Sequence, residues 1–322
     1  MCTAINYKVK DHYFGRNLDL EYHYDERVVI TPRNYPFRFR HLPISNHHPA
    51  MIGMATVVDD YPLYYEGTNE HGLSIAALNF PGNAIYNQVV ADKLNVAPFE
   101  LIPWLLCNCR NLEESICLID TVNICDTAFN NIYPNTPLHW IIAYKDKSIV
   151  VEQTKEGLYI YDNPVGVLTN NPPFPYHLQN LQNYMHLSPK NPVNHFSRRL
   201  DLEPYSRGMG ALGLPGDLSS ASRFIRAAFV KENAESTEQE VDAVSQFFHM
   251  LNVVSMPRGA LIINEKCEIT IYSSCCNTDR GIYYYTTYDN SGVVGICMFH
   301  EDLNESGLCI YPLRSGEIHF EN

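Results

Sequence analysis

The chain has 322 residues, of which 45% are hydrophobic and 18% charged, a balance that favours a folded protein with a large core over a disordered one. Its formal net charge of −13 and its lack of a Lys/Arg cluster argue against a nucleic-acid partner, because phosphate binding needs a basic face. No apolar run is long enough to span a membrane and no signal peptide precedes Cys2, so we expect a cytoplasmic protein without a membrane partner.

The first 20 residues predict a β-hairpin. Residues 2–9 alternate loosely in polarity, a charged Lys-Asp turn follows, and residues 13–17 resume the extended pattern. Such a hairpin folds Arg16 back beside Cys2, where its guanidinium would favour a thiolate. Asp19 lies three residues further on and could orient an ammonium group there. The alternative for Arg16 and Asp19 is a surface ion pair.

Cys2 follows the initiator methionine directly. Removal of Met1 would leave a thiol and a free α-amine on one residue, which then holds a nucleophile and a base together. A thiol with an ordinary pKa of about 8.5 is only slightly ionised at neutral pH, whereas an α-amine titrates near about 7.7 to 8.0 and can accept its proton. The alternative is a small hydrophobic side chain packed at position two.

The rest of the chain predicts strands on both sides of a helical middle. Apolar residues at helical spacing predict a helical region over 98–121, and a capping box of Thr237 with Glu240 predicts the start of a later helix. The predicted strands after the hairpin are 27–32, 51–58, 62–67, 71–78, 138–144, 148–153, 158–161, 166–169, 259–264, 268–273, 282–287 and 293–298.

This order predicts an α+β fold of mainly antiparallel sheets covered by helices, because regular β-α-β alternation is missing. A doubly wound parallel sheet fits the pattern poorly. No repeat, low-complexity tract or linker divides the chain, so we predict one domain over residues 1–322.

Ten scattered cysteines in a chain of this length favour buried reduced thiols over a disulfide framework. Neither Cys107 with Cys109 nor Cys275 with Cys276 has the C-x-x-C spacing of a zinc site. The thirteen histidines form no H-E-x-x-H motif. We therefore predict no bound metal.

Nine ordered sequence blocks make this chain resemble the cholylglycine hydrolases, a family of N-terminal-nucleophile hydrolases that includes bile salt hydrolases and penicillin V acylases. The resemblance runs from Cys2 nearly to the C-terminus. The blocks are MCTA (1–4), YFGRNLD (13–19), ITPRNY (30–35), NEHGL (69–73), LNFPG (78–82), SIVVEQ (148–153), VLTNNP (167–172), GLPGDLSSASRF (213–224) and YTTYDN (285–290).

The resemblance implies a four-layer αββα sandwich and a mechanism without a cofactor. Cys2 would be the nucleophile that attacks an amide carbonyl to form a thioester, and its α-amine would carry the proton to the leaving nitrogen. Arg16 and Asp19 would support the thiolate and the amine.

The same resemblance implies that Asn79 and Asn170 form the oxyanion hole and that Arg223 completes the polar site. Preorganised donors of this kind typically contribute about 100- to 1000-fold each to the rate. Taken without the resemblance, the two asparagines are equally typical of turns before proline, and Arg223 is typical of a surface helix.

The residue at position 79 also bears on the substrate. Bile salt hydrolases resemble this chain in having Asn79, whereas penicillin V acylases tend to carry tyrosine there, so the resemblance implies glycine- or taurine-conjugated bile salts. By similarity, Leu20, Tyr24 and Tyr65 would line a wide apolar pocket for the steroid. Their alternative is ordinary packing in the core or at its rim.

Two other functions stay open at this stage. One is a penicillin V acylase or another N-acyl amide hydrolase, and the other is a non-catalytic binding protein that retains the fold. Relatives are commonly homotetramers, so the resemblance also implies a homotetramer, with the loop over 191–214 as an assembly element.

Overall fold

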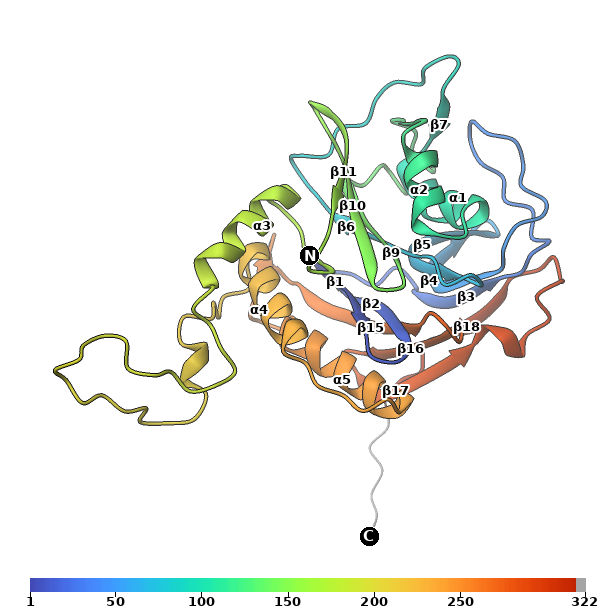
Figure 1. The fold of residues 1–322 in the computed structure, drawn as a ribbon. Helices are drawn as coiled ribbons and strands as arrows, with labels where there is room; N and C mark the ends of the chain where they lie inside the picture. The colour runs from blue at the N-terminus through green and yellow to red at the C-terminus, as the bar shows by residue number, and fades with distance from the viewer. Residues whose placement is uncertain (317–322) are drawn as a thin grey trace, which may run out of the picture.

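Two β-sheets lie face to face, and helices cover the outer face of each (Figure 1). The structure is a computed structural model that describes residues 1–316. The four layers confirm the predicted α+β fold and its mainly antiparallel sheets, whereas the extent of a single domain stays a prediction. The five α-helices of the described residues are α1 (Leu101–Asn108), α2 (Leu112–Ile119), α3 (Phe174–Leu181), α4 (Ser220–Glu232) and α5 (Glu240–Asn252).

Helices α1 and α2 cover the larger sheet, and α4 and α5 cover the smaller sheet on the opposite side of the molecule. In spatial order the six-stranded sheet contains β12 (Val167–Leu168), β1 (Cys2–Lys8), β2 (His12–Leu20), β15 (Ile269–Asn277), β16 (Ile282–Thr287) and β17 (Asn290–Cys297). The eight-stranded sheet contains β11 (Gly157–Asp162), β10 (Lys147–Thr154), β9 (Leu138–Tyr144), β6 (Ser74–Asn79), β5 (Tyr61–Asn69), β4 (Met51–Val58), β3 (Arg27–Thr31) and β18 (Cys309–Pro312).

Two short pairs complete the described strands. A parallel pair joins β7 (Leu94–Val96) to β8 (Val122–Ile124), and a hairpin joins β13 (Ile262–Ile263) to β14 (Lys266–Cys267).

The alternation of side chains along β9 shows how one strand serves two cores. Ile141 and Ala143 point between the two sheets, while Trp140 and Ile142 point to the cluster under α1 and α2. Successive side chains of a strand leave opposite faces, so a strand that is covered on both sides reads as a continuous apolar run. This explains why the run over 138–144 was predictable at its observed bounds.

The helical region predicted over 98–121 is confirmed, but it is divided into two α-helices because the chain breaks between α1 and α2. Cys109 adopts an extended conformation (φ −122°, ψ 144°), and the Asn111 side chain caps α2 by accepting a hydrogen bond from Glu114 N at 2.8 Å. The apolar period continues across the break because both helices contact the same sheet.

The predicted capping box is wrong. Helix α5 begins at Glu240 after Gln239, which makes no side-chain cap. The Thr237 hydroxyl instead accepts from Gln239 N and donates to the Asp242 side chain in the first turn of α5. Of the strand predicted over 259–264, only the two residues of β13 form one.

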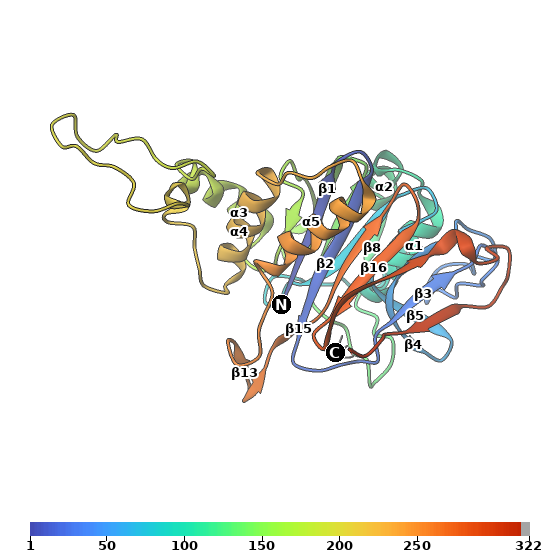
Figure 2. The same ribbon diagram turned by 90° about the horizontal axis from the view of Figure 1, so that it is seen from below.

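The opening hairpin is confirmed as β1 and β2. Cys2 pairs with Leu18, and Ala4 pairs with Arg16. Paired residues project from the same face of a sheet, so the Cys2 and Arg16 side chains share one face. Seen from below, β1 and β2 run beside each other beneath α4 and α5, and residues 191–214 extend away from the layers (Figure 2).

We predict that Gly15→Ala destabilises the fold, because a Cβ at this position of β2 would lie 1.9 Å from the Ser274 carbonyl oxygen. Overpacking of this kind typically lowers the free energy of unfolding by about 1–3 kcal/mol, and a backbone clash lies at or above the upper end. Urea unfolding measures the change. Gly216→Ala, whose Cβ would meet no atom within 4 Å, is the control. Equal stability of both variants would contradict the prediction.

Candidate active site

Cys2 lies at the beginning of β1, where its backbone makes several polar contacts. The Cys2 backbone N–H donates to Asn170 Oδ1 at 2.9 Å, and the Cys2 side chain is 2% exposed. Met1 precedes Cys2 and continues the β1–β2 pairing, since Asp19 N donates to Met1 O at 2.8 Å. The Cys2 nitrogen is therefore a peptide nitrogen in this form of the chain.

Arg223 reaches this strand from α4, whose first turn is capped by the Ser219 hydroxyl. The guanidinium is fully buried and donates to the Cys2 carbonyl, to Thr3 Oγ1 at 2.7 Å and to Asn170 Oδ1 at 2.7 Å. Burial lowers the pKa of Arg223. These bonds tie the helix, the strand and the Asn170 turn to one cation.

The Asn170 side chain connects Cys2 with Asn79. Its oxygen accepts from the Cys2 nitrogen, and its Nδ2 donates to the Asn79 carbonyl at 2.7 Å. The Asn170 backbone N–H donates to Ser220 Oγ at 2.8 Å, so the turn is also attached to α4. An amide nitrogen carries two protons, so one Nδ2 proton remains for a bound group.

Arg16 lies fully buried between the sheets on the Cys2 face of β2. Its Nη1 donates to the carbonyls of Tyr65, at 3.2 Å, and Ala77, and lies 3.9 Å from Glu66 Oε2. Burial alone would lower the pKa of Arg16, but the nearby Cys2 and Glu66 outweigh it and raise the pKa. The guanidinium is thus a permanent positive charge beside the thiol.

Asp19 is buried at the end of β2, where Thr270 Oγ1 donates to its Oδ1 at 2.6 Å. Burial raises the pKa of Asp19, and the Met1 ammonium, Arg223 and the Thr270 hydrogen bond partly oppose that rise. Its other oxygen, Oδ2, has no hydrogen-bond partner among the described residues. This oxygen is available to an ammonium group at the beginning of β1.

The structure therefore brings all six predicted polar residues to one place. They come from five separate parts of the chain: β1, β2, the end of β6, the turn after β12, and α4. The six are Cys2, Arg16, Asp19, Asn79, Asn170 and Arg223.

Glu268 is a member of this cluster that the sequence did not indicate. Its buried carboxylate forms an ion pair with the Met1 ammonium, which also donates to the Asp19 carbonyl. Burial raises the pKa of Glu268, and the Met1 ammonium opposes that rise. No motif marks this position, and its location immediately before β15 is the only signal that could have found it.

The three residues predicted to contact substrate lie near β2 and β5. Leu20 and Tyr65 are partly buried against the core between the sheets, and Tyr24 is 44% exposed. The Thr56 hydroxyl links two of them, because Thr56 Oγ1 lies 2.8 Å from both the Tyr24 carbonyl and the Tyr65 hydroxyl. Their role in binding stays a prediction.

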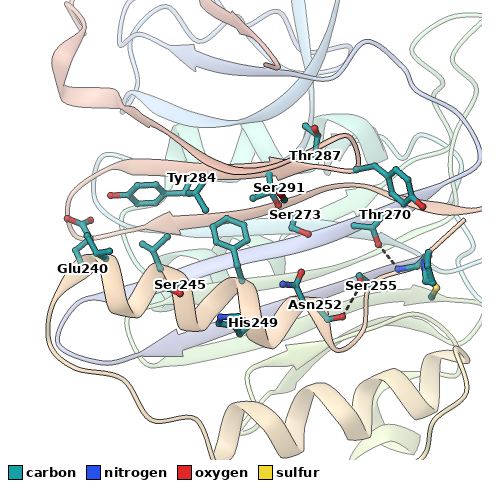
Figure 3. Close-up of a pocket in the computed structure, with 18 residues that line it drawn as sticks. Glu240, Ser245, His249, Asn252, Ser255, Thr270, Ser273, Tyr284, Thr287 and Ser291 are labelled. Carbon is teal, nitrogen blue, oxygen red and sulfur yellow. Dashed lines mark hydrogen bonds between the residues drawn. The ribbon is translucent and has the colours of Figure 1, made fainter. Parts of the chain in front are cut away.

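A groove of about 600 Å³ lies between α5 and the strands β15 to β17 (Figure 3). Cys2 is absent from its lining, so the groove is not the place where Cys2 would meet a substrate. Thr270 connects the groove to the polar cluster, because this residue lines the groove and also donates a hydrogen bond to Asp19.

Residues 1–316 contain neither a cluster of metal ligands nor a helix that could span a membrane. No group of three or more His, Cys, Asp or Glu side chains in this range is arranged to hold a metal ion. Within the same range, no helix has both the length and the apolar character that crossing a bilayer requires.

The αββα layers with a cysteine at the start of β1 define the class of N-terminal-nucleophile hydrolases. Residues 2–311 match the sequence model of the linear amide C–N hydrolases, choloylglycine hydrolase family. The chain belongs to this family.

Individual relatives agree with this assignment over the whole chain. The bile salt hydrolase/transferase of Lactiplantibacillus plantarum is 54% identical over 316 residues, with 98% of each chain covered. The protein of the same name from Clostridium perfringens is 39% identical, with 97% of this chain and 96% of the relative covered.

Solved structures agree in fold. A crystal structure of a variant of conjugated bile acid hydrolase from Clostridium perfringens superposes with a TM-score of 0.92 at 36% identity, covering 100% of both chains. Penicillin V acylase from Agrobacterium tumefaciens shares the fold with a TM-score of 0.77 at 19% identity, covering 99% of this chain and 93% of the other.

We predict that Thr270→Val raises the pKa of Asp19 further, because the buried carboxylate loses a donor. An acid whose pKa is raised by folding loses native stability as pH rises through that pKa, so the stability gap between wild type and variant widens with pH. A hydrogen bond to a charged group typically contributes about 1.5–3 kcal/mol. Urea unfolding at about pH 4 and about pH 8 measures the gap.

The control is Thr68→Val, which removes a buried hydroxyl that bonds Ser74 at 2.7 Å rather than a carboxylate. Its effect on the free energy of unfolding should be the same at both pH values. A gap for Thr270→Val that stays constant with pH would contradict the prediction.

Proposed function

We propose that this protein hydrolyses the amide bond of glycine- or taurine-conjugated bile salts. The observation that carries the proposal is the contact of the Cys2 nitrogen with Asn170 Oδ1 inside a buried cluster that includes Arg16, Asp19 and Arg223. The names of the relatives from Lactiplantibacillus plantarum and Clostridium perfringens support the choice of substrate.

Removal of Met1 converts the Cys2 nitrogen into a free amine two bonds from the thiol-bearing carbon. The amine takes the thiol proton, and the thiolate attacks the substrate carbonyl beside the fixed charge of Arg16. The ammonium, oriented by Asp19 and the Asn170 oxygen, then protonates the departing glycine or taurine nitrogen. Water activated by the same amine cleaves the thioester and releases the bile acid.

The tetrahedral intermediate carries a negative oxygen that needs donors in place before it forms. We assign this task to Asn79 and Asn170. The hydrogen bond from the Asn170 side-chain amide to the Asn79 backbone carbonyl holds the two residues together. Arg223 keeps the Asn170 oxygen turned toward Cys2, so the Nδ2 protons of Asn170 point away from it. Neutral amides serve this role without titrating.

The steroid would lie against Leu20, Tyr24 and Tyr65, next to the carbonyl that Arg16 holds. Asn79 in place of tyrosine favours this substrate over penicillin V. A cytoplasmic location fits the ten cysteines, which all lie within the described residues and form no disulfide.

The test compares turnover of glycocholate, taurocholate and penicillin V by the purified enzyme. We expect hydrolysis of the two bile salts to exceed that of penicillin V, and a preference for penicillin V would reverse the assignment. Cys2→Ser should lower hydrolysis by at least about 1000-fold with the fold intact by circular dichroism, because the nucleophile is lost. Undiminished turnover by this variant would remove the mechanism.

Mass spectrometry of the N-terminus checks the remaining requirement. Active enzyme should begin at Cys2, because the amine that carries the proton exists only after Met1 is removed. Full activity of a chain that still carries Met1 would show that the amine is not the base.

We further propose that residues 191–214 bind a second copy of the chain in a homotetramer. This segment extends from the layers and exposes large apolar side chains, including Phe196 at 84% and Tyr205 at 82% (Figure 1). Apolar surface of this kind on a projecting segment is typical of an interaction site.

We predict that Phe196→Ser combined with Tyr205→Ser dissociates the oligomer. Burial of one large apolar side chain contributes about 1.5–3 kcal/mol, so two of them change the dissociation constant by about 100-fold or more. Analytical ultracentrifugation measures the oligomeric state. Ile132→Ser, which alters an equally exposed side chain outside the segment (81%), is the control. A wild-type chain that sediments as a monomer would refute the assembly.

A further inference from the structure

Two buried histidines contact consecutive carbonyl groups in the turn that carries Asn170. His139 Nε2 lies 2.9 Å from the Thr169 carbonyl oxygen, and His177 Nε2 lies 2.9 Å from the Asn170 carbonyl oxygen. Both rings are fully buried. A carbonyl oxygen can only accept, so each Nε2 carries a proton and donates it.

His139 also contacts the segment that carries Asn79. Its ring stacks on Phe80, the residue after Asn79, with ring centroids 4.3 Å apart and planes inclined by 5°. The β6–β9 register places His139 opposite Leu78, the residue before Asn79. One imidazole therefore lies against both asparagine segments.

Glu152 supports His139 from β10. His139 Nδ1 lies 3.1 Å from Glu152 Oε1, which also accepts from Phe174 N at 3.0 Å. His139 Nε2–H donates a hydrogen bond to the Thr169 carbonyl. A second hydrogen bond, between Nδ1 and the Glu152 carboxylate, then gives both ring nitrogens a partner. The carboxylate thus fixes the ring orientation and ties it to the start of α3.

The second ring is held by stacking. His177 packs on Phe224 of α4, with centroids 4.8 Å apart and planes inclined by 24°. Burial lowers the pKa of His177 to about 4, so the ring is a neutral donor at physiological pH. Helix α4 also contributes Arg223, which bonds the Asn170 side chain.

We propose that His139 and His177 are positioning residues for amide hydrolysis, which hold the Thr169 and Asn170 carbonyls so that the Asn170 side chain stays aligned between Cys2 and Asn79. The inference rests on the proposed function. Rotation of the turn about either peptide would move the Asn170 amide, whose oxygen and nitrogen lie 2.9 Å from Cys2 N and 2.7 Å from Asn79 O. A misplacement of about 1 Å at such a site can lower a rate by about 100-fold.

The test uses His139→Phe and His177→Phe, which keep an aromatic ring for stacking but remove the donor. We expect each to lower kcat per active site by about 10- to 100-fold with little change in KM, because the oxyanion donor moves while substrate contacts stay. His139→Gln and His177→Gln place a nitrogen donor near the same point and should restore most of kcat.

Two further readouts separate positioning from a general loss of structure. Alkylation of Cys2 by iodoacetamide at fixed pH should fall much less than hydrolysis, since Arg16 and Asp19 are unchanged and no oxyanion has to be stabilised in this reaction. A bile-acid aldehyde, which forms a tetrahedral adduct with Cys2, should bind more weakly in proportion to the loss of kcat/KM.

His48→Phe is the matched control, because His48 is also a buried histidine whose Nε2 contacts a carbonyl, that of Tyr35 at 2.8 Å, and whose ring packs on Phe37. It should lower stability without changing kcat per active site. Wild-type kcat in both histidine-to-Phe variants would overturn the proposal. So would a loss of alkylation equal to the loss of hydrolysis. If wild type cleaves only penicillin V, the substrate assignment fails, but the same variants assayed with penicillin V still test the histidines.

Discussion

The hydrogen bonding of β1 on both of its edges is the constraint on which the active site depends. A chain terminus is usually poorly ordered unless it is tied into the fold, and here β1 lies between β2 and β12. Strand β2 carries Arg16 and Asp19, and β12 leads directly into the turn with Asn170. The register that pairs Cys2 with Leu18 therefore decides that Cys2 and Arg16 share one face of the sheet, because a slip of one residue would turn Cys2 to the opposite face.

Buried ionisable side chains are concentrated around the beginning of β1. Two arginines, Arg16 and Arg223, and three acids, Asp19, Glu66 and Glu268, are each less than 5% exposed. Removing one partner of a buried ion pair typically destabilises a protein by about 3–5 kcal/mol, so such a cluster is a liability for folding alone. It is expected where the protonation of a nucleophile and a base must be controlled, as in the amidohydrolase chemistry of this family.

Local sequence patterns predicted strands that are covered by apolar residues on both faces. They failed where contacts with other parts of the chain set the end of a helix or the partner of a side chain. The run over 138–144 was predictable because both faces of β9 are covered, so apolar residues alone mark it. The break at Cys109 was not, because the two short helices on either side contact one sheet and keep a common period. Thr237 looked like a cap, but its hydroxyl bonds Gln239 N and the Asp242 side chain, and α5 begins only at Glu240.

The sequence by itself determined the α+β class, the opening hairpin and, through the motif blocks, the six polar residues that meet at Cys2. These follow from alternation, period and short motifs, all of which act over a few neighbouring residues. Only the tertiary structure decided that Glu268 faces the beginning of β1 and that His139 lies between the two asparagine segments. The partners in these contacts are far apart in sequence, 267 residues in the case of Met1 and Glu268, so they meet only through strand pairing within each sheet and the packing of one sheet on the other.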